Sequence, residues 1–253
     1  VAIVTGGSSG IGLALTNHLI AKKWHVFIVD LQQPVLPVLP DLTTFLSADV
    51  SDWDQLAAAF EKAHARFSRL DFCALNAGID DRDDIFRSIS SGDLPPRRPN
   101  MRTFEVNLFG PYYGLKLAAH YMSRNPEPVA QGGKVVVTAS VSGFRAHPLL
   151  PQYSSTKYGV LGLVRALAPA AKEVNIRINC LCPAVTATGL PPPGLMEKLP
   201  ESIITPMSTL LRGFDELAEF DRLATEGRAK WVSQGQSGAS VEGNLEELYY
   251  REE

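Results

Sequence analysis

A tyrosine and a lysine four residues apart are the side chains whose types and spacing could do chemistry most directly. Tyr153 and Lys157 begin a stretch predicted to form a long helix, so both side chains project from one face of it. A phenol loses its proton at a pH of about 10, and a nearby ammonium group lowers that pKa. Such a pair can take a proton from an alcohol or return one to a ketone. The same spacing is common on exposed helices, so the pair needs support from other residues.

A serine at the end of a predicted strand gives that support. Ser140 follows residues 134–138, an apolar run typical of a buried strand, and precedes Tyr153 by 13 residues. Open α/β sheets bind their ligands at the carboxyl ends of the strands. The position of Ser140 therefore favours a ligand site close to the tyrosine and lysine.

A glycine-rich turn follows the first predicted strand. Gly6, Gly10 and Gly12 in the run Thr-Gly-Gly-Ser-Ser-Gly-Ile-Gly would let a dinucleotide pyrophosphate approach the backbone closely. A helix that opens near Gly10 would point the positive end of its dipole at the same group. The alternative is a tight strand-to-helix turn without a ligand. Its place at the first strand-to-helix crossing favours a dinucleotide site.

An aspartate at the end of the second predicted strand indicates which dinucleotide would bind. Asp30 stands 18 residues after Gly12, where an acidic side chain can accept from both adenosine ribose hydroxyls of NAD and repel the 2′-phosphate of NADP. Neither residues 31–33 nor residues 6–12 contain a Lys or Arg to neutralise that phosphate. We therefore expect NAD as the cofactor, although Asp30 could instead cap a strand-to-loop turn.

The elements that must position these residues alternate between strands and helices. This pattern predicts an α/β chain with a single-domain Rossmann-like, doubly wound parallel sheet flanked by helices over residues 1–253. The predicted strands are residues 1–5, 25–29, 45–50, 71–75, 134–138, 176–181 and 239–242, and the predicted helices are residues 12–23, 52–66, 101–124, 153–172 and 214–226. Residues 34–40 hold three prolines and read as a connector, and residues 79–100 read as a loop.

Composition and charge exclude several classes of partner. A net charge of -3, a pI near 6.0 and the absence of basic runs argue against nucleic acid and anionic membranes. No apolar stretch is long enough to span a bilayer. The 5 histidines do not pair with Cys, Asp or Glu at metal-site spacings, so we expect no metal.

The cysteines and the first residue indicate in which cellular compartment the protein is found. Three cysteines are too few for a disulfide framework and favour a reducing compartment, the cytoplasm. The chain opens on an apolar strand without Met, which we interpret as a trimmed start. A targeting segment upstream of Val1 would not be visible in this sequence.

Taken together, the motifs resemble those of the short-chain dehydrogenase/reductase family in order and spacing. The motifs are Thr5 to Gly12, Asp49-Val50, Asn76-Ala77-Gly78, Asn107, Ser140 and Tyr153 to Lys157. The resemblance extends to about Thr188, and the chain is similar to NAD-dependent members related to 15-hydroxyprostaglandin dehydrogenase and to fungal biosynthetic members. It implies an oxidoreductase that transfers a hydride between NAD(H) and a secondary alcohol or ketone.

The resemblance also implies roles for individual residues. Tyr153 would be the general acid/base, Lys157 would lower its pKa and bind the nicotinamide ribose, and Ser140 would hydrogen-bond the substrate oxygen. Asn107 would support a water relay, unless it only bonds locally within its helix. Asp49 and Val50 would touch adenine, Asn76 would steady the sheet and Thr188 could hold the carboxamide. The implied cofactor-binding set is Gly6, Ser8, Ser9, Gly10, Ile11, Gly12, Asp30, Asp49, Val50, Asn76, Ala77, Gly78, Tyr153, Lys157, Pro183 and Thr188.

Two departures from the family pattern stand out. Pro183 is followed by Ala184 where the family usually has Gly, which predicts a modest change in loop shape. Residues 235–253 look shortened and end in an acidic tail, although the family's last strand often helps subunits associate. The resemblance implies a homo-oligomer, either a dimer or a tetramer.

Three further interpretations concern substrate and alternatives. Residues 188–228 occupy the position of the family's substrate lid, and their apolar residues suggest a hydrophobic, secondary-metabolite-like small molecule; Met207 and Leu211 could equally pack the lid onto the body. Residues 80–84, Asp-Asp-Arg-Asp-Asp, lack the Gly and distal Glu of a calcium loop and read as a solvated turn. The alternative function is a dehydrogenase-like scaffold recruited for non-redox cyclisation or isomerisation, or for NAD sensing.

Overall fold

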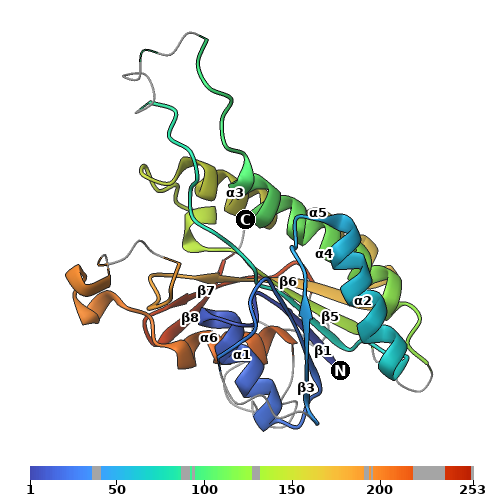
Figure 1. Ribbon diagram of the computed structural model, residues 1–253. Coiled ribbons are helices and arrows are strands. Elements are labelled where there is room, and N and C mark those ends of the chain that lie inside the picture. The colour runs from blue at the N-terminus through green and yellow to red at the C-terminus, as the bar shows by residue number, and fades with distance from the viewer. Residues whose placement is uncertain are drawn as a thin grey trace.

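The described residues of the computed structural model form a single, mostly parallel sheet with helices on both faces (Figure 1). The structure describes residues 1–35, 41–86, 92, 95–126, 132–190, 194, 196–218 and 237–251. Within them the strand order is β3-β2-β1-β4-β5-β6-β7-β8, and only β7 and β8 pair antiparallel. The strands are β1 (Ala2–Thr5), β2 (Val26–Asp30), β3 (Thr43–Ser47), β4 (Phe72–Leu75), β5 (Gly133–Thr138), β6 (Ile176–Pro183), β7 (Ser240–Asn244) and β8 (Glu247–Arg251).

The helices divide between the two faces of the sheet. Residues of α2, α4 and α5 share one buried apolar cluster, whereas residues of α1 and α6 share a second cluster on the opposite face. Figure 1 shows the same division. The helices are α1 (Gly10–Ala21), α2 (Trp53–Phe67), α3 (Arg102–Phe104), α4 (Gly110–Met122), α5 (Pro151–Glu173) and α6 (Met207–Ala218). Short turns are the π-helical η2 (Glu105–Phe109) and the 3-10 turns η3 (Val141–Gly143), η4 (Met196–Lys198) and η5 (Glu201–Ile203).

The apolar strands supply both clusters by simple alternation. Ile3 and Cys73 face the cluster of α2, α4 and α5, while their neighbours Val4 and Ala74 face the cluster of α1 and α6. A parallel sheet covered on both faces needs apolar residues at every position of its strands. This need explains why the central strands are continuous apolar runs and why they were readable from sequence.

The order of the strands creates a ligand position at one edge of the sheet. The chain moves outward from β1 to β2 and β3, then returns to place β4 on the other side of β1. Ligands bind outside the carboxyl ends of the strands where the order reverses in this way. The glycine turn after β1, the turn after β4 and Ser140 after β5 all lie at that end of the sheet.

Two predicted elements have different boundaries in the structure, and one predicted helix is interrupted. β3 spans Thr43–Ser47 and not residues 45–50, and α6 begins at Met207, directly after Pro206, and not at residue 214. Residues 219–226 of that predicted helix lie outside the described residues. The predicted helix 101–124 is divided by the π-helical turn η2.

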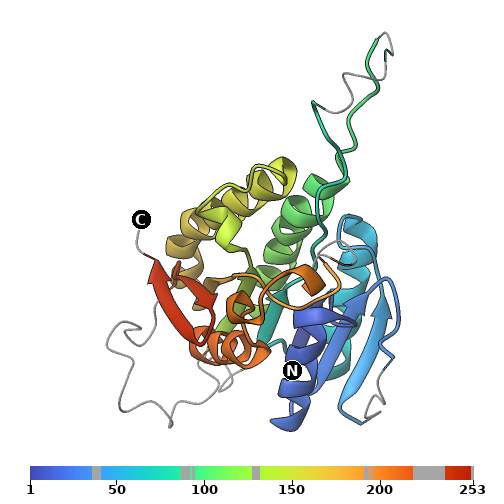
Figure 2. The same cartoon turned by 90° about the vertical axis from the view of Figure 1, so that its left-hand side faces the viewer.

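The acidic tail forms a strand that the sequence analysis missed. β8 pairs antiparallel with β7, and Leu248 and Tyr250 pack against the apolar cluster that includes α6 (Figure 2). The hydroxyl of Tyr250 hydrogen-bonds the carboxylate of Glu216 on α6. Apolar residues that face the core at every second position are typical of a half-buried strand, and here the flanking charges of Glu247 and Arg251 obscured them.

Among the described helices, none combines the length and apolar character needed to cross a bilayer.

A buried carboxylate on β7 provides a test of this hairpin. Glu242 is 4% exposed, and Arg251 of β8 donates to its Oε2 from Nη2 at 2.6 Å and from Nε at 2.7 Å. Arg251→Met should lower the free energy of unfolding by about 2 kcal/mol, because it leaves a buried charge poorly compensated. Urea denaturation measures the loss. The double variant Glu242→Gln/Arg251→Met should recover most of it, and equal losses in the single and double variants would contradict this account.

Candidate active site

The glycine turn after β1 is packed so closely that side chains cannot replace its glycines. A Cβ on Gly12 would lie 2.1 Å from the carbonyl oxygen of Gly6, and one on Gly6 would lie 2.9 Å from Cα of Ala77. Gly6 also has a φ of +64°, in the left-handed region that favours glycine. These contacts press the turn against the start of α1 and against the turn after β4.

The first turn of α1 has the features of an anion site. Its N-cap residue, Ser9, makes no side-chain cap hydrogen bond, and no acidic residue lies in the first turn. Among the described residues, the buried Oγ of Ser8 also has no hydrogen-bond partner. Free amide donors at the positive end of a helix dipole bind phosphate groups. The residues present therefore fit a dinucleotide pyrophosphate.

Asp30 lies beside this turn at the end of β2. Its Oδ2 accepts from the backbone N–H of Ser8 at 3.0 Å, and its Oδ1 accepts from that of Leu31 at 2.7 Å. The carboxylate thus caps its own turn, as the simpler interpretation expects. A carboxylate offers about four acceptor positions, so Asp30 retains capacity for ribose hydroxyls.

Thr5 joins the carboxyl ends of β1 and β4. Its Oγ1 accepts from the backbone N–H groups of Asn76 at 2.9 Å and Ala77 at 3.1 Å. The side-chain Oδ1 of Asn76 in turn accepts from the hydroxyl of Thr138 on β5 at 3.0 Å. Asn76 therefore bonds across three neighbouring strands, which agrees with the steadying role that the resemblance implies.

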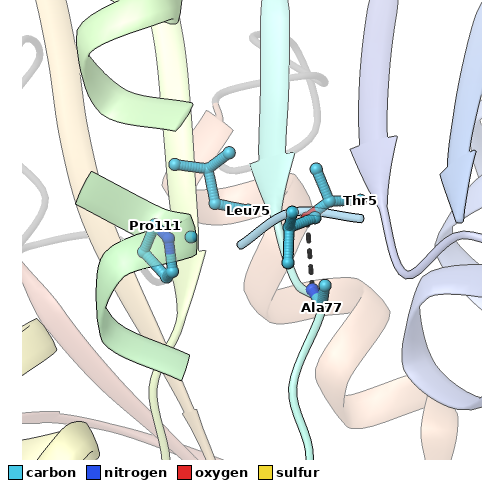
Figure 3. A pocket seen from close by; sticks show the side chains of 6 residues that line it. Thr5, Leu75, Ala77 and Pro111 are labelled. Carbon is cyan, nitrogen blue, oxygen red and sulfur yellow. Dashed lines mark hydrogen bonds between the residues drawn. The ribbon is translucent and has the colours of Figure 1, made fainter. Parts of the chain in front are cut away.

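A small pocket opens beside this junction. Figure 3 shows Thr5, Leu75, Ala77 and Pro111 around it, with the hydrogen bond between Thr5 and Ala77. Val50 also lines the pocket, and a Cβ on Gly110 would lie 3.0 Å from its Cγ2. The structure thus brings Val50 to the end of β1, next to the glycine turn.

Asp49, which the resemblance places at adenine, is already engaged by protein groups. The hydroxyl of Ser51 donates to its Oδ1 at 2.7 Å, and Arg102 of α3 forms an ion pair with its Oδ2. Burial acts to raise the pKa of Asp49, but these hydrogen bonds and the Arg102 charge outweigh it and hold the pKa below its ordinary value. Arg102 carried no signal in the sequence analysis, because its partner lies 53 residues away.

Ser140, Tyr153 and Lys157 come together at the carboxyl end of β5. Ser140 is 7% exposed and hydrogen-bonds with the phenol of Tyr153, on the first turn of α5. Lys157 lies one turn further along, with its Nζ 5.3 Å from the centre of the Tyr153 ring. The same Nζ donates to the carbonyl oxygen of Thr138 at 2.8 Å. The three side chains form one polar group, in which Ser140 and Lys157 are buried and Tyr153 is half-buried.

Burial dominates the electrostatics of this group. It raises the pKa of Tyr153 above its ordinary value, although the hydrogen bond with Ser140 acts in the opposite direction. Burial also lowers the pKa of Lys157 to about 8. Removal from water is the largest influence on the phenol, and the lowering of its pKa by Lys157 that the sequence analysis expects stays a prediction. A neutral phenol is therefore the favoured form at neutral pH.

Asn107 occupies the π-helical turn η2. Its Oδ1 accepts from the backbone N–H of Ile79 at 2.8 Å, and its Nδ2 donates to the carbonyl oxygen of the same residue at 2.7 Å. A Cβ on Gly78 would lie 3.5 Å from this Oδ1 and 3.7 Å from Nζ of Lys157. Asn107 therefore lies near the lysine, but its side chain bonds the loop after β4 and not its own helix.

The remaining predicted residues lie at the end of β6, in the segment after it, and in the first turn of α1. Pro183 is buried at the end of β6, and the next residue, Ala184, donates to the carbonyl oxygen of Gly243 at 2.9 Å. Ala184 has no positive φ, so its side chain costs no backbone strain. A Cβ on Gly10 would lie 3.3 Å from Cβ of Thr188, which places the start of the lid beside the glycine turn. Ile11 packs against the cluster of α1 and α6.

One functional candidate was missed. The sequence analysis treated residues 80–84 as a solvated turn, but the carboxylate of Asp81 accepts from the backbone N–H groups of Gln152 and Tyr153 at the start of α5. A helix N-terminus preceded by a non-capping Leu150 was the available signal, but nothing local identified the partner.

Comparison with known proteins agrees with this geometry. Residues 1–193 match the family profile described as short chain dehydrogenase. The short-chain dehydrogenase/reductase prx6 of Penicillium rubens is 35% identical over 99% of this chain and 85% of its own length. The 5'-hydroxyaverantin dehydrogenase stcG of Emericella nidulans is 32% identical over 72% of this chain and 65% of its own length. Across its Penicillium relatives the chain spans from 56% to 85% of their length.

A solved structure shows the same fold. The 3-ketoacyl-(acyl-carrier-protein) reductase of Brucella melitensis, complexed with NADH, superposes with a TM-score of 0.76 at 21% identity, over 96% of each chain. The family profile over residues 1–193 and the 35% identity to prx6 over 99% of the chain show that the chain belongs to the short-chain dehydrogenase/reductase family. It is an oxidoreductase homologous to fungal secondary-metabolite members, and a nicotinamide cofactor is typical of that family.

The buried lysine leads to a prediction about stability. An unfolded lysine has a pKa of about 10.4, so the charged form in the folded protein costs about 3 kcal/mol below pH 8. Between about pH 8 and pH 10.4 the lysine of the unfolded chain holds its proton and that of the folded chain does not. The cost therefore shrinks as the pH rises from about 8 to about 10.4. Lys157→Met should therefore unfold at a higher temperature than the parent protein at pH 7, with a difference that narrows towards pH 10.

Thermal unfolding at several pH values measures this effect. Lys116→Met, at an exposed position of α4, is the matched control and should show no such pH-dependent gain. A Lys157→Met protein that is less stable at pH 7 would show that the contact with Thr138 outweighs the cost of burying the charge.

Proposed function

We propose that this protein interconverts a secondary alcohol and a ketone with NAD(H), and that Tyr153 is its general acid/base. The observation that carries the proposal is the polar group at the carboxyl end of β5, in which Ser140 and Lys157 are buried and Tyr153 is half-buried. A binding module has no need to bury an ammonium beside a half-buried phenol, because removing either from water costs free energy.

The chain's own residues would handle the proton. In ketone reduction the neutral phenol of Tyr153 donates its proton to the carbonyl oxygen, and in alcohol oxidation the phenolate takes the hydroxyl proton. Ser140 hydrogen-bonds the same oxygen and stabilises the charge that develops on it. When bound, NAD(H) supplies or accepts the hydride at its nicotinamide ring. Asn107, close to Lys157, would support the path by which the proton exchanges with solvent.

The cofactor would be held along the carboxyl edge of the sheet. Gly6, Gly10 and Gly12 would hold the pyrophosphate at the start of α1, where Ser9 makes no side-chain cap hydrogen bond. Ser8 would contribute its hydroxyl, because its backbone N–H already donates to Asp30. Asp30 would accept from the adenosine ribose, and its charge disfavours a 2′-phosphate. The NADH of the Brucella reductase is compatible with this proposal.

A hydrophobic secondary-metabolite alcohol is the proposed substrate class. The relative named as a 5'-hydroxyaverantin dehydrogenase supports it, as do the apolar side chains of Val185 and Leu190, each 38% exposed in the segment after β6. Met207 and Leu211 give no support, because both pack against the apolar cluster that includes α6.

The proposal also includes a homo-oligomeric state and a cytoplasmic location. Phe109, Tyr112 and Tyr158 on η2, α4 and α5 are 47%, 53% and 46% exposed, which favours a homo-oligomer that covers them. The three cysteines are free and buried, which is compatible with a reducing compartment such as the cytoplasm. We treat residues 1–253 as one NAD-binding domain with a lid over residues 188–228.

Removal of one hydroxyl tests the reaction. Tyr153→Phe should lower kcat for oxidation of 1-tetralol with NAD by at least about 100-fold, because the general acid/base is lost. NADH affinity, followed by nicotinamide fluorescence, should change little. Tyr158→Phe, on the same helix as Tyr153, removes a phenol that donates to the carbonyl oxygen of Phe144 after η3, and it should retain activity. Equal activity in both variants would favour a non-redox role.

Removal of one carboxylate tests the cofactor. Asp30→Ser should weaken NADH binding by about tenfold, the value of a hydrogen bond to a charged group, and should strengthen NADPH binding. Asp54→Ser, a change on the first turn of α2, is the control. Tighter binding of NADPH than NADH by the parent protein would contradict the choice of NAD.

A further inference from the structure

The start of α5 carries Tyr153 but has no cap in its own sequence. Its N-cap residue, Leu150, makes no side-chain cap hydrogen bond, and no acidic residue lies in the first turn. Pro151, the first helical residue, has no N–H to donate. The amides of Gln152 and Tyr153 are therefore the first donors that need an acceptor from elsewhere.

Asp81 supplies that acceptor from a different part of the chain. Its Oδ2 accepts from the N–H of Gln152 at 3.0 Å, and its Oδ1 accepts from the N–H of Tyr153 at 2.5 Å. The partners are 71 and 72 residues apart in sequence. One half-buried carboxylate thus satisfies two amides and places a negative charge at the positive end of the helix dipole.

The segment that carries Asp81 is itself held in place. Both backbone groups of Ile79 bond the side chain of Asn107, and the hydroxyl of Thr103 donates to the carbonyl oxygen of Asp80 at 2.9 Å. On the other side, Nε2 of Gln152 donates to the carbonyl oxygen of Asn100 at 2.8 Å. The helix start is therefore tied to the described residues at both ends of the connection between β4 and α3. The coloured parts of that connection extend away from the helices in Figures 1 and 2.

Tyr153 and Lys157 are anchored in different ways. The Nζ of Lys157 bonds directly to Thr138 at the end of β5. The backbone of Tyr153, one turn earlier, is tied by Asp81 to the loop after β4. The alignment of the phenol with Ser140 and Lys157 thus depends on the contact with Asp81.

We propose that Asp81 is a positioning residue that holds Tyr153 in its reactive place by capping α5. This inference rests on the proposed function, since it assigns Tyr153 the role of acid/base. A displacement of about 1 Å at a reacting group can cost about 100-fold in rate. The contact therefore matters for turnover, whereas cofactor affinity should depend on it little.

The test compares three variants of the full chain. Asp81→Ala removes both acceptors, Asp81→Asn keeps one carbonyl oxygen, and Asp83→Ala removes a carboxylate of the same loop that makes no such contact among the described residues. Hydrogen exchange at the amides of Gln152 and Tyr153 should be faster in Asp81→Ala by about tenfold. It should be intermediate in Asp81→Asn and unchanged in Asp83→Ala.

Kinetics then separate positioning from a general loss of structure. The kcat for 1-tetralol, expressed per NADH-binding site, should fall by about tenfold in Asp81→Ala and by less in Asp81→Asn, with the Kd for NADH within about twofold. A purely structural role would lower the number of NADH-binding sites but leave kcat per site unchanged.

The outcomes distinguish this inference from the proposed function. If Tyr153→Phe abolishes turnover while Asp81→Ala keeps the parent kcat per site, the positioning role is wrong and the proposed function stands. If the parent protein does not oxidise 1-tetralol, hydrogen exchange decides the matter. Faster exchange confined to the start of α5 supports the placement of Tyr153 by Asp81, and unchanged exchange overturns it.

Discussion

The contact between the carboxyl ends of β1 and β4 is the constraint on which the site depends. These strands are neighbours because the chain reverses direction across the sheet at β1. Thr5 accepts there from two amides of the turn after β4, and Gly6 lets that turn approach without a side chain between them. The cofactor turn, the pocket beside Val50 and the loop that carries Asp81 all begin at this junction. A bulkier residue at Gly6 would displace all three at once.

The proposed catalytic group costs the folded protein free energy, unlike the hydrogen bonds between β1 and β4. Lys157 is buried and Tyr153 is half-buried, and removal from water disfavours the charged form of each. The surrounding thiols offer no compensation: burial raises the pKa of Cys180 to about 12, so this neighbour stays neutral. A carbonyl oxygen of Thr138 and the hydroxyl of Ser140 provide the hydrogen bonds that make the arrangement possible. Stability is given up locally where a proton must move, as is common at reactive sites.

Local patterns were enough for much of the fold and part of the site. The alternating elements, the glycine turn after β1, Asp30 and the Tyr153–Lys157 spacing are each readable within a few residues. The structure departs from those patterns where partners are distant in sequence. Asp81 looked like part of a solvated turn because its amide partners lie more than 70 residues away. β8 was hidden by the charges that flank it, since only Leu248 to Tyr250 between Glu247 and Arg251 are uncharged.

The hairpin of β7 and β8 also decides which surfaces can join two molecules. β7 is bonded to β6 on one side and to β8 on the other, so both of its hydrogen-bonding edges are used. A second sheet cannot extend this one through β7. The strand that now ends the described sheet carries a charged side chain at each of its ends, Glu247 and Arg251, and charged edge strands resist pairing with other chains. Edge-to-edge growth is thus discouraged at this side of the sheet.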